Sequence, residues 1–192
     1  MAKRKKAMTT STLAHHLLIA MPALTDPHFQ HSVTFLCEHN ENGAMGIIIN
    51  RPLTLTEKEL FNHLSIPLKH EGIDRHVLAG GPVQTDRGFV IHRPHGEWLS
   101  TWHVNDELEI TTSRDVLQAI GKGDGPPDAF IALGYAGWGP GQLEKELAEN
   151  AWLIVAASAH IVFDVPFEQR WNEAARLLGI NPAFLSAQTG HA

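Results

Sequence analysis

The segment from Ser32 to Pro52, "SVTFLCEHNENGAMGIIINRP", constrains the fold more than any other part of the chain. Val33, Phe35 and Cys37 occupy every second position in its first half, and its second half is a continuous apolar run. The turn-forming stretch "HNENG" separates the two halves. This pattern is typical of two antiparallel strands joined by a hairpin turn. We therefore expect a sheet built around this hairpin, which Arg51-Pro52 ends.

The rest of the chain predicts strands and helices that alternate within one domain. We expect buried strands at "HLLIAMP", "AFIALGY" and "WLIVAAS", and shorter strand segments at "HVLAGGPV", "GFVIHRP", "WLSTWHV" and "ELEITTS". A strand-helix-strand-helix order closes the chain and suggests parallel pairing beside the antiparallel hairpin. The predicted fold class is therefore α/β, in a mixed α+β arrangement.

Several helices have recognisable ends in the sequence. Thr56 and Glu59 have the spacing of a capping box before one helix, and Ser113 can cap another over residues 114–120. A third helix follows the glycine-rich turn described below, and a short last helix is expected from Pro182. The helix in "VPFEQRWNEAARLLG" places these residues on one face: Phe167, Trp171, Ala174 and Leu178.

A short basic tail distinguishes the N-terminal end from the rest of the chain. Lys3, Arg4, Lys5 and Lys6 lie in a segment without acidic residues. The whole chain has a net charge of −6, and without this tail 11 basic residues face 21 acidic ones, a net charge of −10. We expect residues 1–11 to be a disordered tail and residues 12–192 to form a single domain. The acidic body disfavours nucleic-acid binding, because DNA attracts a positive surface.

The composition also bears on the cellular compartment. The apolar run "LLIAMPAL" follows the basic tail, but it is short and contains a proline, which argues against a secretory signal. No apolar stretch is long enough to span a bilayer. Cys37 is the single cysteine, so no internal disulfide can form. We expect a cytoplasmic protein that does not enter a membrane.

The glycine-rich stretch "LGYAGWGPGQLEKEL", residues 133–147, resembles sites that bind phosphate groups. It lacks the lysine and hydroxyl of a P-loop, the spacing of a dinucleotide fingerprint and the nucleophile of a catalytic elbow. Gly139 is the expected N-cap of the following helix, and Pro140 its first-turn residue. Glu144 and Glu146 lie close behind the helix start and would repel a phosphate.

Two interpretations of this stretch remain open. The favoured one is a structural turn, in which Tyr135 and Trp138 pack beneath the chain. The other is a binding surface, in which both aromatic side chains form the wall of a pocket and the free N–H groups of Gly141 and Gln142 bind an anion.

Two histidine pairs and the single cysteine are the residues that could bind a metal ion or act as catalytic groups. His28 and His31 are three positions apart, as are His92 and His95, but both pairs lie near prolines and strand ends. We expect surface or capping histidines and no metal site. Cys37 lies in an apolar alternation beside Glu38, which favours a buried structural thiol over a nucleophile. No cofactor is expected.

Polar residues at strand ends provide the remaining candidates. Asn50 and Arg51 end a buried strand, where ligand sites are often built, and Arg51 can pair with a carboxylate of the protein or of a ligand. Gly80-Gly81-Pro82 is a turn that other side chains would not permit. The candidate binding surface consists of Asn50, Arg51, Gly80, Gly81, Tyr135, Trp138, Gly139, Gly141 and Gln142.

Several stretches together resemble the YqgE/AlgH family of bacterial proteins. They include "LIAMP", "DPHFQHSVTFLCEHNENGAMGIIINRP", "GGPVQTDRGFVIH", "LEITTSRDVL", "LGYAGWGPGQLEKEL" and "NAWLIV", and the resemblance runs from about Leu13 to Ala192. It implies a single domain in which a bifurcated mixed sheet curls into a partial barrel with helices outside. It implies no catalytic residues and no cofactor, although members are sometimes labelled transcriptional regulators.

Three functional hypotheses follow. The leading one is a cytoplasmic, non-catalytic binding or regulatory protein with an unidentified protein or small-molecule partner. The second is an enzyme whose cleft combines Asn50, Arg51, His39 and His92 with the turn at Tyr135–Gln142. The third is direct DNA binding through the basic tail. The sequence leaves the oligomeric state open.

Overall fold

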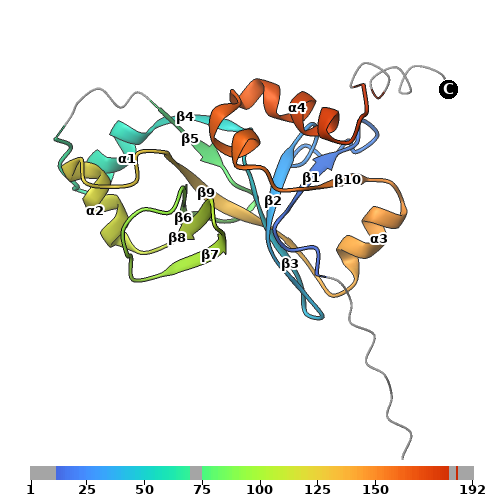
Figure 1. Ribbon diagram of the computed structural model, residues 1–192, viewed down its shortest axis with the longest axis horizontal. Coiled ribbons are helices and arrows are strands. Elements are labelled where there is room, and N and C mark those ends of the chain that lie inside the picture. The colour runs from blue at the N-terminus through green and yellow to red at the C-terminus, as the bar shows by residue number, and fades with distance from the viewer. Residues whose placement is uncertain (1–11, 70–74, 182–184, 186–192) are drawn as a thin grey trace, which may run out of the picture.

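The computed structural model describes residues 12–69, 75–181 and 185 (Figure 1). The strands are β1 (His16–Ala20), β2 (Val33–Asn40), β3 (Gly43–Ile48), β4 (Pro52–Thr56), β5 (His76–Ala79), β6 (Val83–His92), β7 (Thr101–Asn105), β8 (Leu108–Thr111), β9 (Ala129–Trp138) and β10 (Trp152–Ala156). The helices are α1 (Glu57–His63), α2 (Arg114–Lys122), α3 (Gln142–Ala148) and α4 (Arg170–Leu177), with a π-helical turn η1 (His160–Asp164) and a 3-10 turn η2 (Phe167–Gln169). The predicted tail and the helix expected from Pro182 lie outside the described residues, apart from Leu185.

One ten-stranded sheet organises the molecule, in the order β10-β1-β2-β3-β9-β6-β8-β7, with β5 beside β9 and β4 beside β5. The first part of β9 pairs antiparallel with β6 and parallel with β5, whereas its last part pairs antiparallel with β3. Because β9 has three partners, the sheet divides there into two halves. In Figure 1, strands β4 to β8 lie around the first part of β9, and β1, β2, β3 and β10 lie toward its last part. This mixed α/β domain, with its sheet curled into a half-barrel and helices around it, confirms the predicted fold class.

A bulge at Gly134 determines which side chains of β9 face which part of the core. Phe130 and Ala132 belong to the cluster between the sheet and α4, and Ile131 to the cluster beneath α1 and α2. Gly134 has a φ of 75°, and the register against β6 shifts there. Before Gly134, the even-numbered Phe130 and Ala132 face the cluster beneath α4. After Gly134, the odd-numbered Tyr135 faces the same cluster. The bulge thus exchanges the two faces of the strand.

The three hydrophobic clusters correspond to three covering layers. The largest fills the space between the sheet and the η1–α4 segment, where the indole of Trp171 donates to the carbonyl of Ala20 at 2.9 Å. A second cluster lies between α1, α2 and strands β5, β6 and β9. A third lies between α3 and strands β1, β2, β9 and β10, and includes Trp138, Leu143 and Trp152.

The predicted hairpin and first helix are both confirmed. Strands β2 and β3 pair antiparallel from Thr34 opposite Ile48 to Asn40 opposite Gly43. Thr56 caps α1, and the reciprocal capping box with Glu59 is formed. The chain does not leave the sheet after Arg51, however, because Pro52 begins β4, which pairs with β5.

Several local predictions were wrong, because pairing between distant strands overrides local signals. Strand β9 continues through Trp138, so Gly141, with a φ of 73°, is the N-cap of α3 in place of Gly139, and Pro140 precedes the helix. The closing strand-helix-strand unit is not parallel, because β10 pairs antiparallel with β1. The parallel pair is β5 with β9.

The other helix ends also differ from prediction. Ser113 is the N-cap of α2 as expected, but its hydroxyl donates to Asp115 and accepts from no helix N–H group. The Asp115 carboxylate accepts from the Val116 N–H at 3.0 Å instead. Leu178, expected on one face with Trp171 and Ala174, is exposed and is the C-cap residue of α4. Trp171 and Ala174 are buried as expected.

Candidate functional site

Asn50 and Arg51 hold the loop between β1 and β2 against the end of β3. The Asn50 side chain accepts from the Val33 N–H at 2.8 Å and donates to the His31 carbonyl at 3.0 Å. The Arg51 guanidinium donates to three loop carbonyls, those of residues 27, 28 and 30, at 3.0, 2.5 and 2.8 Å. Arg51 was expected to pair with a carboxylate. Instead the carbonyls orient it, and no ion pair within the described residues includes it.

A pocket of about 300 Å³ opens beside this guanidinium. Its volume is at the lower end of the range for small-molecule sites. Three groups in its lining can donate hydrogen bonds, the guanidinium of Arg51, the imidazole of His28 and the hydroxyl of Thr85, and none of its side chains is acidic. The lining consists of His28, Ile48, Arg51, Ala79, Gly81, Pro82 and Thr85, and we refer to it as the Arg51 pocket.

Two backbones make close contact directly behind Gly81, which lines the Arg51 pocket. A Cβ on Gly80 would lie 2.3 Å from the Gly134 carbonyl oxygen, and a Cβ on Gly134 would lie 2.4 Å from that of Gly81. Two non-glycine residues flank the pocket with positive φ, His31 at 58° and Gln84 at 46°. Such conformations cost free energy and are concentrated at functional sites, where the surrounding structure maintains them.

The other predicted surface residues do not line this pocket, and the sheet separates two of their side chains. Tyr135 packs on Phe89 with the core beneath α4, whereas Trp138 is buried under α3. Gln142 accepts from the Gly139 N–H at 3.0 Å and donates to Glu146 at 2.9 Å. The structure therefore brings together Asn50, Arg51, Gly80 and Gly81, with the backbone of Tyr135 against Gly81. The Tyr135 side chain and residues Trp138, Gly139, Gly141 and Gln142 do not line the pocket.

The carboxylate of Glu146 connects α3 with two tryptophans of the third hydrophobic cluster. Its carboxylate accepts from the indole N–H groups of Trp138 at 2.9 Å and Trp152 at 2.8 Å. The two indole rings meet edge to face, and Phe29 packs on both. Glu146 was expected to repel a ligand phosphate, but its structural role is to join α3 to the third hydrophobic cluster.

The residues proposed for an enzyme cleft do not meet. His39 bonds to Glu144 at 2.8 Å and accepts from the Leu13 N–H at 3.0 Å, so its Nε2 carries the proton. Asn50 bonds to Val33 at the opposite end of β2, about 20 Å away at the rise of an extended strand. His92 lies in β6, on the other side of β9, and bonds to Thr111.

His92 is fully buried, contrary to the expectation of a surface or capping histidine. It bonds to the Arg93 carbonyl and to the Thr111 hydroxyl, both at 2.8 Å. Burial lowers the pKa of His92, so the imidazole is neutral at pH 7. Its Nδ1 then donates to the carbonyl, and its Nε2 accepts from the hydroxyl.

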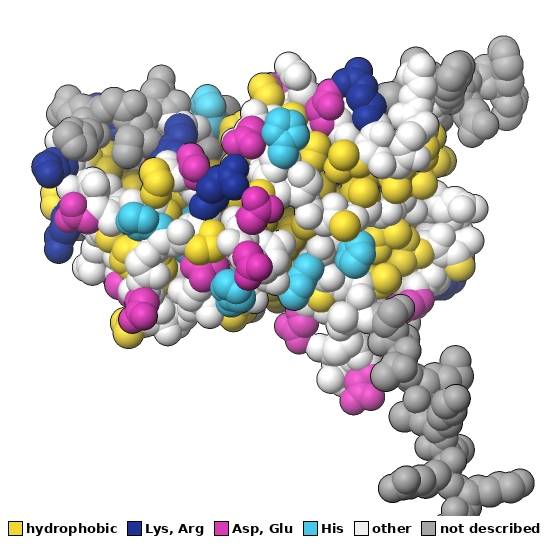
Figure 2. Space-filling model, in the orientation of Figure 1, with side chains coloured by type: hydrophobic (Ala, Val, Ile, Leu, Met, Phe, Trp, Pro, Cys, Tyr) yellow, Lys and Arg dark blue, Asp and Glu magenta, His cyan; other side chains and the backbone are white. Residues whose placement is uncertain are grey.

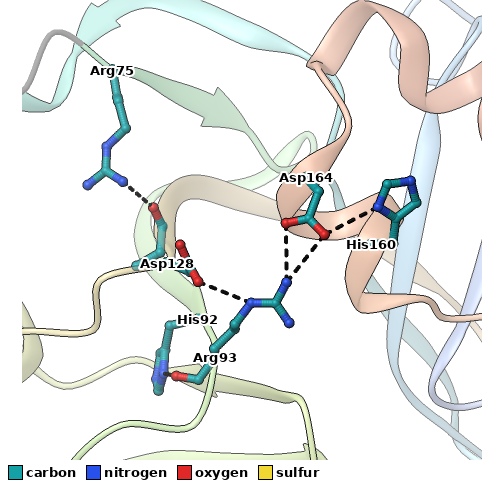
Figure 3. A network of polar contacts seen from close by, with 7 residues as sticks. Arg75, His92, Arg93, Asp128, His160 and Asp164 are labelled. Atoms are coloured by element: carbon teal, nitrogen blue, oxygen red, sulfur yellow. Dashed lines mark hydrogen bonds and ion pairs between the residues drawn. The ribbon is translucent and has the colours of Figure 1, made fainter.

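Arg93 forms the most connected ionic network (Figure 3). Its guanidinium lies between Asp128 at 3.1 Å and Asp164 at 3.2 Å, and it stacks on Phe163. His160 contacts Asp164 at 3.2 Å. This network connects η1 with the start of β9. It adds little stability, because both carboxylates are about half exposed.

Neither a metal site nor a reactive thiol is evident in the part of the chain that the structure describes. No three His, Cys, Asp or Glu side chains there come close enough to bind a metal ion. The thiol of Cys37 donates to the Phe35 carbonyl at 3.6 Å, and burial, with a contribution from Glu38, raises its pKa. The thiol therefore stays protonated and unreactive.

The surface carries acidic side chains over much of the visible face, interspersed with histidines and apolar groups (Figure 2). This distribution agrees with the net charge of −10 outside the basic tail. No helix among the described residues is long and apolar enough to cross a membrane.

Four lining residues of the Arg51 pocket were not predicted from the sequence to belong to a binding site. Ile48 and Ala79 were interpreted only as strand residues, and Thr85 carried no signal because it lies on an exposed strand segment. His28 was considered only as a metal ligand. The pairing of β4 with β5, which brings these segments together, could not be read from local pattern.

A second pocket of about 200 Å³ lies between α1, α2 and the sheet. Leu60, Leu64, Leu117 and Ile131 form most of its apolar floor, and Asp86 and Arg114 lie among its polar lining residues. Arg114 donates to the Leu64 carbonyl at 2.6 Å, which ties α2 to α1.

Comparison with known proteins places the chain in a family. The sequence profile of the AlgH-like family matches residues 17–183. A UPF0301 protein of Nitrosococcus oceani is 56% identical over 179 residues, which cover 93% of this chain and 96% of that protein. A UPF0301 protein of Thioalkalivibrio sulfidiphilus is 51% identical over 183 residues, which cover 95% and 98%.

Solved structures agree with this assignment. The solution structure of the AlgH protein from Pseudomonas aeruginosa aligns over 100% of both chains, with a TM-score of 0.77 and 47% identity. A crystal structure of a Corynebacterium diphtheriae protein aligns over 97% of this chain and 93% of that one with a TM-score of 0.68, and its 18% identity supports the shared fold alone. The resemblance seen in the sequence is thus confirmed, and the chain belongs to the AlgH-like family.

Proposed function

We propose that this chain is a non-catalytic, cytoplasmic protein that binds a small molecule in the Arg51 pocket. One observation carries the proposal: two segments about 30 residues apart, at Arg51 and at Gly81-Pro82, meet around a guanidinium that has no carboxylate partner. Charged side chains that are removed from water are usually paired with an opposite charge. The half-buried Arg51 bonds only to neutral carbonyls among the described residues. Close backbone packing at Gly81 and the positive φ of Gln84 occur at or next to lining residues of this pocket.

The pocket also offers a way for ligand binding to change the protein surface. His28 lines the pocket and belongs to the loop whose carbonyls hold Arg51. A ligand that contacts the guanidinium therefore acts on the same loop, and the ordering of that loop would differ between the free and bound states. We propose that such a change, presented to a protein partner, underlies a regulatory role like the one that the transcriptional label of the family suggests. The acidic body favours a protein partner over direct contact with DNA.

The proposal can be tested by amide NMR of the full-length chain with a library of small neutral, cationic and anionic compounds. We expect at least one compound class to shift resonances of residues 28, 51 and 79–85 in a saturable manner. The 200 Å³ pocket between α1 and α2 provides an internal comparison. Resonance shifts confined to the pocket between α1 and α2, or no saturable shift at all, would refute the assignment of the Arg51 pocket as the ligand site.

A further inference from the structure

The charge of the Arg51 pocket identifies the class of its ligand. We propose, building on the function proposed above, that the Arg51 pocket binds a small anion with a carboxylate or phosphate group.

The guanidinium of Arg51 is oriented but not neutralised. Arginine has five N–H donors and a permanent positive charge. The three carbonyls use donors on Nη1 and Nη2, and no bond from Nε is found among the described residues. Carbonyl groups carry no net charge, so the cation keeps its attraction for an anion. Since the carbonyls hold it in place, an anion meets a donor group that is already ordered.

The remaining lining suits the same ligand. The hydroxyl of Thr85 and the imidazole of His28 can both donate to an anionic oxygen. Ile48, Ala79 and Pro82 supply apolar walls beside these donors. A volume of about 300 Å³ fits a ligand of few heavy atoms.

The contrast with other hollows shows that this lining is not a general property of the surface. Four other pockets on the described residues each include an acidic side chain. The acids are Asp86 in the pocket between α1 and α2, Glu38 in two pockets beside β2, and Glu41 in a pocket at the β2–β3 turn. In a protein with 21 acidic residues, the Arg51 pocket combines a cation with a lining free of carboxylates.

The decisive variant places a carboxylate in the pocket without touching Arg51. Thr85 is exposed, so Thr85→Glu should fold normally and bring an anion next to the guanidinium. Thr85→Gln has nearly the same shape without the charge. Gln118→Glu adds the same charge on an exposed position of α2, outside the pocket lining. The probes are inorganic phosphate and succinate at constant ionic strength, and the readouts are amide shifts and dissociation constants.

We expect at least one probe to bind the wild-type pocket. Thr85→Glu should weaken its binding by about tenfold or more, because a like charge opposes the ligand at close range. Thr85→Gln should weaken it less, and Gln118→Glu should leave it within about twofold, since exposed charges at a distance are screened. Binding of phosphate alone identifies a phosphoryl ligand, binding of succinate alone identifies a carboxylate ligand, and binding of both supports the shared chemistry.

Other results overturn the inference in distinguishable ways. If neutral compounds shift the pocket resonances and neither anion does, the ligand class is wrong while the proposed binding function stands. If Thr85→Gln weakens anion binding as much as Thr85→Glu, shape decides binding and the charge argument fails. If no compound of any charge binds the pocket, both the ligand class and the proposed function are refuted.

Discussion

Replacing Glu146 with alanine tests whether one carboxylate holds α3 to the domain. Its carboxylate accepts the indole protons of Trp138 and Trp152, which are only 5% and 3% exposed. In Glu146→Ala both buried donors lose their partner. An unsatisfied buried donor costs about 1–3 kcal/mol, and partial access of water to the half-buried Glu146 position reduces that cost. We therefore expect a loss of about 2–4 kcal/mol in the free energy of unfolding.

Urea unfolding, followed by tryptophan fluorescence and by far-UV circular dichroism, measures this loss directly. In a domain of this size, it corresponds to a fall in melting temperature of about 5–15 °C. Glu146→Gln keeps an acceptor oxygen but removes the charge, so we expect about half the loss. Glu149→Ala removes an exposed carboxylate of the same region, whose ion pair with Lys145 spans 3.9 Å, and should change stability by less than about 0.5 kcal/mol.

The reasoning fails if Glu146→Ala unfolds within about 0.5 kcal/mol of wild type, since the two indole bonds would then contribute nothing. It also fails if Glu149→Ala is as destabilising as Glu146→Ala. That result would show that any loss of acidic charge near α3 has the same effect, and the buried donors would not be its cause.

Two further predictions concern the sheet. Gly80→Ala places a Cβ 2.3 Å from the Gly134 carbonyl, so we expect a loss of about 1–3 kcal/mol or more by urea unfolding. Gly137→Ala, whose Cβ would make only an ordinary contact at 3.7 Å, should change stability by less than about 1 kcal/mol. Burial lowers the pKa of His92, so below its unfolded value near 6.5 the unfolded chain binds a proton that the folded chain excludes, and stability falls with falling pH. Between pH 7 and pH 5, the free energy of unfolding should therefore fall less in His92→Gln than in His95→Gln or wild type. An equal fall in all three proteins would contradict this account.

Features that depend on neighbours in the sequence could be predicted. The hairpin of β2 and β3 follows from alternation and a turn, and the start of α1 from the spacing of Thr56 and Glu59. The buried core of β9 follows from its apolar run. In each of these, the local preference and the final structure agree.

Features that depend on pairing between distant strands could not be predicted from the sequence. The "GYAGW" segment contains two glycines and resembles a turn, but Gly134 forms a bulge, and pairing with β3 keeps residues 136–138 extended. For the same reason, the N-cap of α3 is Gly141 and not the predicted Gly139. Of the candidate surface residues, Arg51 and Gly81 line the same pocket, and both could be singled out as polar or glycine positions at strand ends. Thr85 and Ile48 join it only through the folded sheet.

The three partners of β9 also determine the order in which this chain can fold. Residues 129–138 bridge strands that were synthesised up to about 90 residues earlier, so the two halves of the sheet cannot join until β9 has left the ribosome. Completion takes longer still, because β1 stays an open edge until β10 arrives and pairs His16 with Ala156. During synthesis the emerging N-terminal strands therefore expose unpaired apolar edges. We expect chaperone binding to nascent chains to end only after residue 156 has emerged.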